Sequence, residues 1–154
     1  MLTGRQLHGL AVLSRDGAEL GRVRDVIAER ESGSIAGFFV ESSGLLSREL
    51  YLPAAAVEQL DLGGVIVRDK SALMRMPKQL PGEPQLALRG SRLLRAGGGD
   101  GGTVADILVE NNMVCGLEIS QGLLGDLRHK RRFLPRERVE NRGDTFIEID
   151  QTLS

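Results

Sequence analysis

The sequence predicts an all-β protein made of two tandem small barrels of about six strands each. Two observations support this prediction. The stretches at residues 21–27 and 35–40 recur in the second half of the chain at residues 102–108 and 114–119. Both halves also consist of short apolar runs separated by turn residues, as in an antiparallel meander. An internal repeat of this kind indicates two copies of one structural unit.

The repeat divides the chain at a cluster of prolines. We expect a first domain at residues 1–75, a proline-containing linker at 76–84 and a second domain at 85–154. Three of the five prolines fall between residues 77 and 84, and proline favours an extended, semi-rigid chain. Domains this small are marginally stable alone, so the copies are expected to pack together or to dimerise.

The first copy contains six candidate strands. They are the runs at residues 7–14, 20–30, 35–42, 50–52, 57–62 and 65–69. The Asp-Gly pair at residues 16–17 predicts a hairpin turn, because glycine accepts a positive φ. Pro53 ends the fourth run, and the three alanines after it suit one helical turn. Closing such strands into a barrel removes their exposed edges.

The second copy aligns with the first over most of its length. The aligned pairs include Asp25 with Asp106, Gly37 with Gly116, Pro53 with Pro135, Val65 with Ile147, Val67 with Ile149, and the Gly-Leu-Leu runs at 44–46 and 122–124. The turn after the second strand is shorter in this copy, where two asparagines at 111–112 predict type I′. The loop before the fourth strand is longer, and its extra residues are basic.

The order of these motifs resembles the PRC-barrel family. The motifs are Gly-x-Val-x-Asp-Val-Ile from residue 21, Ile-x-Gly-Phe-x-Val from residue 35, and Leu-Pro at residues 52–53. The family includes the barrel of the photosynthetic reaction-centre H subunit and the C-terminal domain of the ribosome maturation factor RimM. The resemblance implies a binding or adaptor module and no enzyme. The chain lacks the membrane helix of the first protein and the N-terminal domain of the second, so neither role transfers directly.

Composition excludes several classes of function. The chain has 20 basic and 21 acidic residues, so it has no bulk attraction for nucleic acid or anionic lipid. Its one cysteine, Cys115, excludes an internal disulfide and a cysteine-based zinc site, and we expect its side chain in the core. No apolar run is long enough for a membrane span and no signal peptide is recognisable, which favours a cytoplasmic location.

No residue pattern predicts catalysis, a metal site or a cofactor. His8 and His129 have no second histidine or cysteine at ligand spacing. The glycine-rich stretch 97–102 lacks the lysine of a phosphate-binding loop, so it is predicted to be a hairpin loop. Asp25 and Asp106 are either functional carboxylates or acceptors for backbone amides at a strand bend. Their repetition favours the second role.

Two regions are candidates for partner binding. Phe39 occupies the position that Glu118 has in the second copy, which predicts a face covered by the other barrel or by another subunit. The second region is the basic loop 128–138. Its candidate contacts are Arg128, Lys130, Arg131 and Arg132. This loop is either a solvated tip or a contact for an anionic partner, such as an acidic protein surface or RNA.

We therefore expect a non-catalytic cytoplasmic adaptor or scaffold that binds another protein, with a homo-oligomer as a further candidate assembly. The alternative is an RNA- or ribosome-associated maturation factor that uses the basic loop 128–138. No aromatic residue lies within the basic run, so base stacking is not supported and RNA is the less favoured partner.

Overall fold

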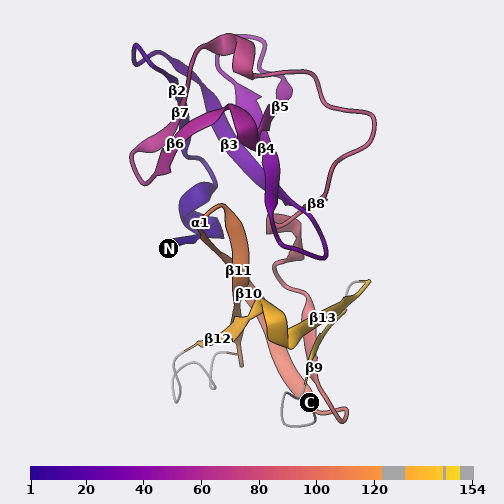
Figure 1. Ribbon diagram of the computed structural model, residues 1–154. Helices are drawn as coiled ribbons and strands as arrows, with labels where there is room; N and C mark the ends of the chain where they lie inside the picture. Colours follow the sequence, from indigo (N-terminus) through magenta and orange to yellow (C-terminus); the bar gives the residue numbers. More distant parts are fainter. Residues whose placement is uncertain (123–130, 144, 150–154) are drawn as a thin grey trace.

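Two β-sheet units lie end to end in the computed structural model of the chain (Figure 1). The structure describes residues 1–122, 131–143 and 145–149. Each unit is a seven-stranded sheet. The all-β class and the two tandem barrel-like units predicted from the sequence are therefore confirmed.

The first sheet has the order β5-β4-β3-β2-β7-β6. Its strands are β2 (Ala11–Ser14), β3 (Glu19–Ala28), β4 (Ile35–Ser42), β5 (Glu49–Pro53), β6 (Val57–Asp61) and β7 (Gly64–Val67). Strands β2 and β7 are parallel, and the other neighbours in this order are antiparallel. The 3-10 turn η1 (Ala54–Ala56) follows Pro53, where the sequence predicts a helical turn. A second 3-10 turn, η2 (Lys70–Ala72), follows β7.

The second sheet repeats this arrangement in the order β12-β11-β10-β9-β14-β13. Its strands are β9 (Arg92–Arg95), β10 (Asp100–Glu110), β11 (Met113–Ser120), β12 (Arg132–Pro135), β13 (Val139–Arg142) and β14 (Thr145–Glu148). The turn η4 (Arg136–Arg138) takes the place of η1. Asn111 and Asn112 have φ angles of 52° and 61°, the positive values that a type I′ turn requires.

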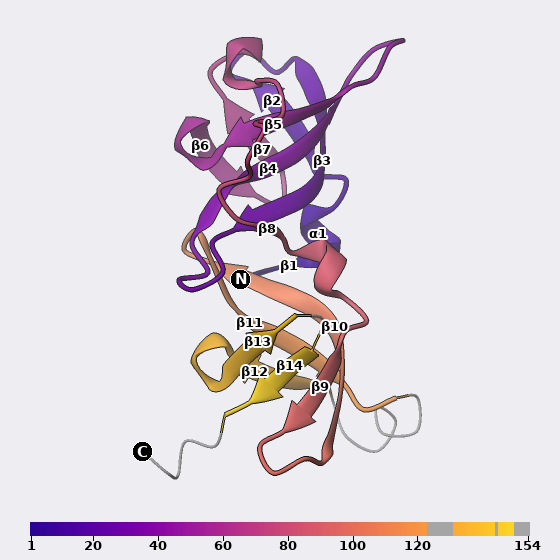
Figure 2. The same ribbon diagram turned by 90° about the vertical axis from the view of Figure 1, so that its right-hand side faces the viewer.

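The two units exchange their first strands. The short strand β1 (Leu2–Thr3) starts the first copy but pairs with β10 of the second sheet. The short strand β8 (Glu83–Pro84) stands at the matching place before the second copy, and it pairs with β3 of the first sheet. Figure 2 shows both strands at the junction between the sheets. The exchange is reciprocal, so each copy completes the sheet of the other.

This exchange crosses the domain boundaries expected from the sequence, which stay a prediction. Residues 2–3 fall inside the expected first domain, yet they belong to the second sheet. Residues 83–84 fall inside the expected linker 76–84, yet they belong to the first sheet. The physical reason is that each short segment satisfies backbone groups of a strand in the other copy.

A second symmetric contact joins the turns of the two long hairpins. Ile35 N donates a hydrogen bond to Asn112 O at 3.0 Å, and Val114 N donates one to Gly33 O at 2.8 Å. Ile35 and Val114 are equivalent positions of the two copies, and both side chains are buried. The two bonds are therefore related by an approximate twofold axis between the copies.

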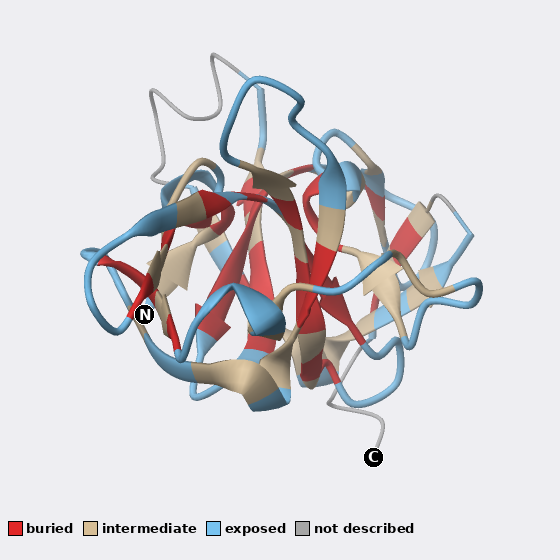
Figure 3. Cartoon of the chain, turned by 90° about the horizontal axis from the view of Figure 1, so that it is seen from above, coloured by how far each residue is buried: buried red, intermediate tan, exposed pale blue. Residues whose placement is uncertain are grey.

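One hydrophobic core extends through both copies. Seen from above, the buried residues lie along the strands and the exposed residues lie in the surrounding loops (Figure 3). The short helix α1 (Gly4–Leu7) and the turn η3 (Leu86–Leu88) contribute Leu7 and Leu86 to this core at the junction. A Cβ added at Gly4 would lie 2.5 Å from Leu86 Cδ2, so α1 and η3 are in direct contact.

The register of β14 differs by one residue from the alignment made by sequence. Parallel pairing with β9 places Phe146 and Glu148 at the positions that Val65 and Val67 occupy beside β2. Phe146 and Glu148 are buried, whereas Ile149, which the sequence aligns with Val67, is 40% exposed. The sequence alignment is wrong here because a pattern of apolar residues does not place a glutamate in a core position.

Candidate functional site

The repeated carboxylates Asp25 and Asp106 link the two copies. Each accepts a hydrogen bond from the N–H of the next residue, at 2.7 Å in β3 and 2.8 Å in β10, beside an irregularity in the strand register. Asp25 also accepts one from Leu86 N in η3 at 2.8 Å, and Asp106 accepts one from Arg5 N in α1 at 3.1 Å. Each carboxylate therefore binds a turn that belongs to the other copy.

The surroundings of the two aspartates give both a structural role. Asp106 is fully buried, and Arg5 Nε lies 3.3 Å from its Oδ2. Burial raises the pKa of Asp25, and the hydrogen bonds from the backbone N–H of Leu86 and Val26 oppose that rise. The acceptor role at a strand bend agrees with the expectation from the repeat, but the contact across copies has no signal in the sequence.

The repeated glycines lie beneath aromatic rings of the neighbouring strand. A Cβ on Gly37 would lie 2.5 Å from Cζ of Tyr51, and a Cβ on Gly116 would lie 2.5 Å from Cε2 of Phe133. An aromatic ring packed over a strand glycine compensates for the missing side chain. Both glycines therefore hold the sheets together and leave no room for a larger residue.

The repeated prolines end equivalent strands of the two copies: Pro53 is the last residue of β5 and Pro135 is the last residue of β12. Pro53 pairs with Gly37 in β4, and Pro135 pairs with Gly116 in β11. Each proline immediately precedes a 3-10 turn, η1 or η4. Proline has no backbone N–H and cannot continue the ladder, so it favours this change of direction. These positions also serve the fold.

Phe39 is half-buried on β4, directly opposite Tyr51 on β5. Its counterpart Glu118 in the second copy forms ion pairs with two arginines. Arg131 Nη1 lies 3.0 Å from Glu118 Oε1, and Arg5 Nη2 lies 3.8 Å from the same oxygen. The equivalent face of the second copy is therefore engaged by the chain itself. Binding of a partner by Phe39 stays a prediction.

The basic loop 128–138 is partly described. Arg128 and Lys130 lie outside the described residues. Arg131 forms the ion pair with Glu118, and Arg136 Nη2 donates a hydrogen bond to Arg30 O across the junction. The described arginines of this segment therefore bind other parts of the protein, which a solvated tip would not do.

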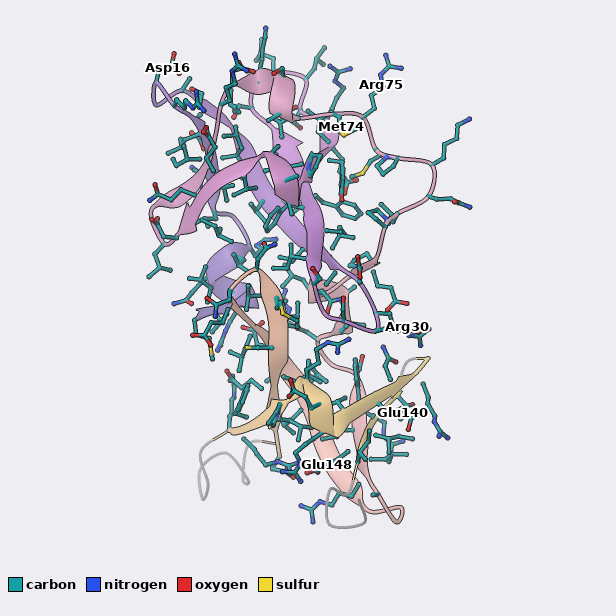
Figure 4. All side chains as sticks on the ribbon, viewed as in Figure 1. Asp16, Arg30, Met74, Arg75, Glu140 and Glu148 are labelled. Carbon is teal, nitrogen blue, oxygen red and sulfur yellow. The ribbon has the colours of Figure 1, made fainter. Side chains whose placement is uncertain are left out.

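Arg132 and Arg138 form an ionic cluster with Glu148. The cluster lies at the end of the second sheet that faces away from the junction, where Glu148 is labelled in Figure 4. Arg132 Nη1 donates to both carboxylate oxygens of Glu148 at 3.0 Å, and Arg138 Nη2 donates to Oε1 at 2.9 Å. Glu148 is only 8% exposed. Arg95 lines the same shallow pocket. Sequence reasoning named Arg138 only as the end of the basic loop 128–138 and missed Arg95 and Glu148. The one available signal was a glutamate within an apolar strand.

The hairpin between β4 and β5 carries an exposed apolar tip, formed by Leu45 and Leu46. Leu45 is fully exposed and Leu46 is 88% exposed. Ser42 and Arg48 close the base of this hairpin: Ser42 N donates to Arg48 O at 2.8 Å, and Arg48 N donates to Ser42 Oγ at 2.9 Å. Each leucine forgoes about 1.5–3 kcal/mol by remaining in water. The sequence contains a signal for this tip, because the Gly-Leu-Leu run is repeated, but its exposure follows only from the fold.

A small cavity lies at the junction of the two copies. It has a volume of about 80 Å³, and Leu88, Val114 and Phe146 line it together with Arg30 and Arg136. Figure 4 labels Arg30 beside this junction. A cavity of this size holds a few water molecules but no ligand of metabolite size, since ligand pockets measure about 300–1,000 Å³.

The described residues contain no group of three or more His, Cys, Asp or Glu side chains placed to hold a metal ion. Within the same residues, no helix combines the length and apolar character needed to cross a membrane.

Cys115 is half-buried instead of in the core. Burial raises the pKa of its thiol, so the thiolate needed for nucleophilic chemistry is disfavoured near neutral pH.

Comparison with known proteins agrees with this architecture. The PRC-barrel domain matches residues 1–73, which contain the six strands β2 to β7. No curated protein matches the chain at a significant level. The second copy repeats the strand order of the matched region. The match assigns the first copy, residues 1–73, to the PRC-barrel domain family.

Proposed function

We propose that the protein is a non-catalytic cytoplasmic adaptor that binds another protein through the tip formed by Leu45 and Leu46. The observation that carries this proposal is the exposure of two adjacent leucines on a hairpin whose base is hydrogen-bonded. An apolar tip on an ordered support gains free energy when a partner covers it, and little conformational entropy is lost on binding.

The surroundings of the carboxylates that the structure describes support an adaptor over an enzyme. The buried carboxylates among the described residues are bound to backbone N–H groups or to arginines. The junction cavity is too small for a substrate of ordinary size. Domains of the PRC-barrel family are generally non-catalytic, and the matched region lies within that family.

The RNA alternative has weaker support in the described residues. Arg131, Arg132 and Arg138 are paired with glutamates, so their charges are partly neutralised within the protein. An RNA-binding surface instead needs a continuous run of cations along the phosphate backbone that glutamates do not interrupt. A gel shift with RNA at low and high salt tests this alternative, because binding through such a surface weakens steeply as salt increases.

The adaptor proposal is tested by the double substitution Leu45→Ser and Leu46→Ser in the full chain. Both side chains are exposed, so the melting temperature is expected to stay within a few degrees of the wild type. Affinity for the partner should fall at least about 100-fold, because two leucine burials of about 1.5 kcal/mol each are lost. The measurement is quantitative co-precipitation of tagged protein from the source cells.

Leu62→Ser is the matched control, because Leu62 is also an exposed leucine at a hairpin turn, 63% exposed. It should retain the proteins that the wild type captures. Capture of the same proteins in the same amounts by the Leu45→Ser, Leu46→Ser protein would contradict the proposal and shift the search to the face around Phe39.

A further inference from the structure

We propose that the cluster of Arg95, Arg132, Arg138 and Glu148 at the free end of the second sheet binds a phosphate monoester group. Arg95, Arg132, Arg138 and Glu148 line one shallow pocket together with Ala96 and Ile149. This pocket lies in the second copy, whereas the Leu45–Leu46 tip lies in the first. The proposal therefore does not depend on the adaptor function.

Comparison of the two copies shows that the cluster is not required by the fold. Strand pairing and the two 3-10 turns identify the equivalent positions. The first copy has Ser14 for Arg95, Leu50 for Arg132, Ala56 for Arg138 and Val67 for Glu148. It closes the same end of the sheet without a charge, and Val67 is fully buried there. Apolar residues can replace a buried ion pair without loss of stability, so the charges in the second copy indicate another role.

Glu148 satisfies only part of the hydrogen-bonding capacity of the two arginines around it. It accepts from Nη1 of Arg132 and from Nη2 of Arg138. Nε and Nη2 of Arg132 and Nε of Arg138 are buried and have no hydrogen-bond partner among the described residues. Buried charged donors without an acceptor are costly, and the Arg132 and Arg138 side chains are partly exposed, so a small shift of either would bring these donors to an oxyanion in the pocket.

The charge of the cluster fits a dianion. Arg95, Arg132 and Arg138 carry three positive charges and Glu148 carries one negative charge, which leaves a net charge of two. A phosphate monoester carries a charge of about −1.5 to −2 at neutral pH. Arg95 is exposed at the mouth of the pocket and makes no ion pair with the described residues, so it is free to meet an incoming anion. The fork of a guanidinium group matches phosphate oxygens in a bidentate manner.

The test is an isothermal calorimetric titration of the full chain with inorganic phosphate and, separately, with phenyl phosphate. The heat of binding gives the affinity for each ligand. Sodium chloride at equal ionic strength serves as the reference, since it screens charges without offering a multidentate acceptor. Both phosphates are expected to bind the wild type. Arg95→Ser introduces the residue of the first copy at an exposed position, and it should weaken binding about tenfold by removing one charge-assisted contact.

Glu148→Gln distinguishes a binding site from a purely structural cluster. The glutamine keeps an acceptor oxygen but removes the negative charge that competes with the ligand, so phosphate should bind about tenfold more tightly. The triple variant Arg132→Leu, Arg138→Ala, Glu148→Val copies the first unit, so it should fold and lose phosphate binding. A structural role alone would change the melting temperatures without producing this pattern of affinities.

Three results would overturn the proposal. The first is no heat of phosphate binding by the wild type beyond the chloride reference. The second is equal phosphate affinity in the wild type and the triple variant. The third is binding of single-stranded RNA that depends on the cluster while both monoesters fail to bind, because this would assign the site to phosphodiesters. Binding of free phosphate and phenyl phosphate with equal affinity would support recognition of the phosphoryl group alone, and tighter binding of phenyl phosphate would add a contact to Ile149 or Ala96.

Discussion

At the scale of single residues, Asp25 and Asp106 each perform two tasks. Each carboxylate accepts a backbone hydrogen bond within its own strand and another from a turn of the other copy. Hydrogen bonds to a charged acceptor are worth about 1.5–3 kcal/mol each. The two aspartates therefore stabilise the junction between the copies as much as the strands that carry them.

The titration of Asp25 leads to a prediction on pH. Burial raises its folded-state pKa above the ordinary value of 3.8, so the folded protein binds this proton more tightly than the unfolded chain. The contribution of Asp25 to stability is therefore fully present below 3.8 and is lost as the pH rises through the raised pKa. Asp25→Asn removes the titration and keeps an acceptor for Leu86 N.

We expect the free energy of unfolding of the wild type, relative to Asp25→Asn, to increase when the pH falls from about 7 to about 4. Urea denaturation of both proteins at the two pH values measures this difference. A decrease of the wild type relative to the variant on acidification would contradict the assignment, because that sign belongs to a carboxylate whose pKa is lowered by folding.

At the scale of the strands, the fit of each sheet depends on aromatic residues packed over glycines. Tyr51 lies over Gly37, and its Oη donates a hydrogen bond to Ala36 O at 3.0 Å. Tyr51 is buried, whereas its counterpart Phe133 is 46% exposed. The first copy therefore tolerates less change at this point than the second.

Gly37→Ala is expected to destabilise the protein by about 1–3 kcal/mol, because the new methyl group would overlap Tyr51 and would lie 2.6 Å from Leu52 O. Gly99→Ala is the control: its Cβ would meet only Arg95 atoms at 3.8 and 4.0 Å, and the change should stay within about 0.5 kcal/mol. Chemical denaturation measures both. Equal stability of the two variants would mean that the ring does not pack over Gly37 in solution.

The sequence predicts much of the fold at this scale. Repeated motifs predict the six strands of each copy, the turn after Pro53 and the positive φ angles of Asn111 and Asn112, and the structure has all of them. It does not predict the exchange of β1 and β8. Strands of two residues have no periodicity, and their partners are chosen by packing between the copies.

The candidate sites were less predictable than the fold. The sequence places Arg132 in a basic loop, because its ion-pair partner Glu148 lies 16 residues further along the chain, in a strand whose other residues are mostly apolar. The core position of Glu148 depends on a register that only pairing with β9 defines. Leu45 and Leu46 belong to the repeated Gly-Leu-Leu run, but their exposure follows only from a hairpin that extends away from the core.

At the scale of the whole molecule, the two copies form one interlocked unit. The exchanged strands, the aspartate contacts and the hydrogen bonds between the hairpin turns are all reciprocal. The hydrophobic core is also shared. Each half alone would lose an exchanged strand and the partner of its aspartate. We therefore expect the copies to unfold together, as a small single domain does.

The most direct test of this interlocked unit is equilibrium unfolding in urea, monitored separately in each copy. Tyr51 is the only tyrosine and the chain has no tryptophan, so tyrosine fluorescence reports on the first copy. Phe133→Trp adds a reporter to the second copy at a partly exposed position.

Asp106→Ala should destabilise the protein by about 2–4 kcal/mol, since it leaves backbone N–H groups without their acceptor. Asp100→Ala, at the exposed first position of β10, is the control: it removes one solvent-exposed hydrogen bond from Gly102 N and should have little effect.

If the two copies form one interlocked unit, the unfolding transitions measured at Tyr51 and at position 133 should have the same midpoint. Asp106→Ala should shift both midpoints to lower urea concentration by the same amount, although the substitution lies in the second copy. Separate transitions, or a shift at position 133 that leaves the Tyr51 midpoint unchanged, would contradict it and would describe two barrels that fold independently.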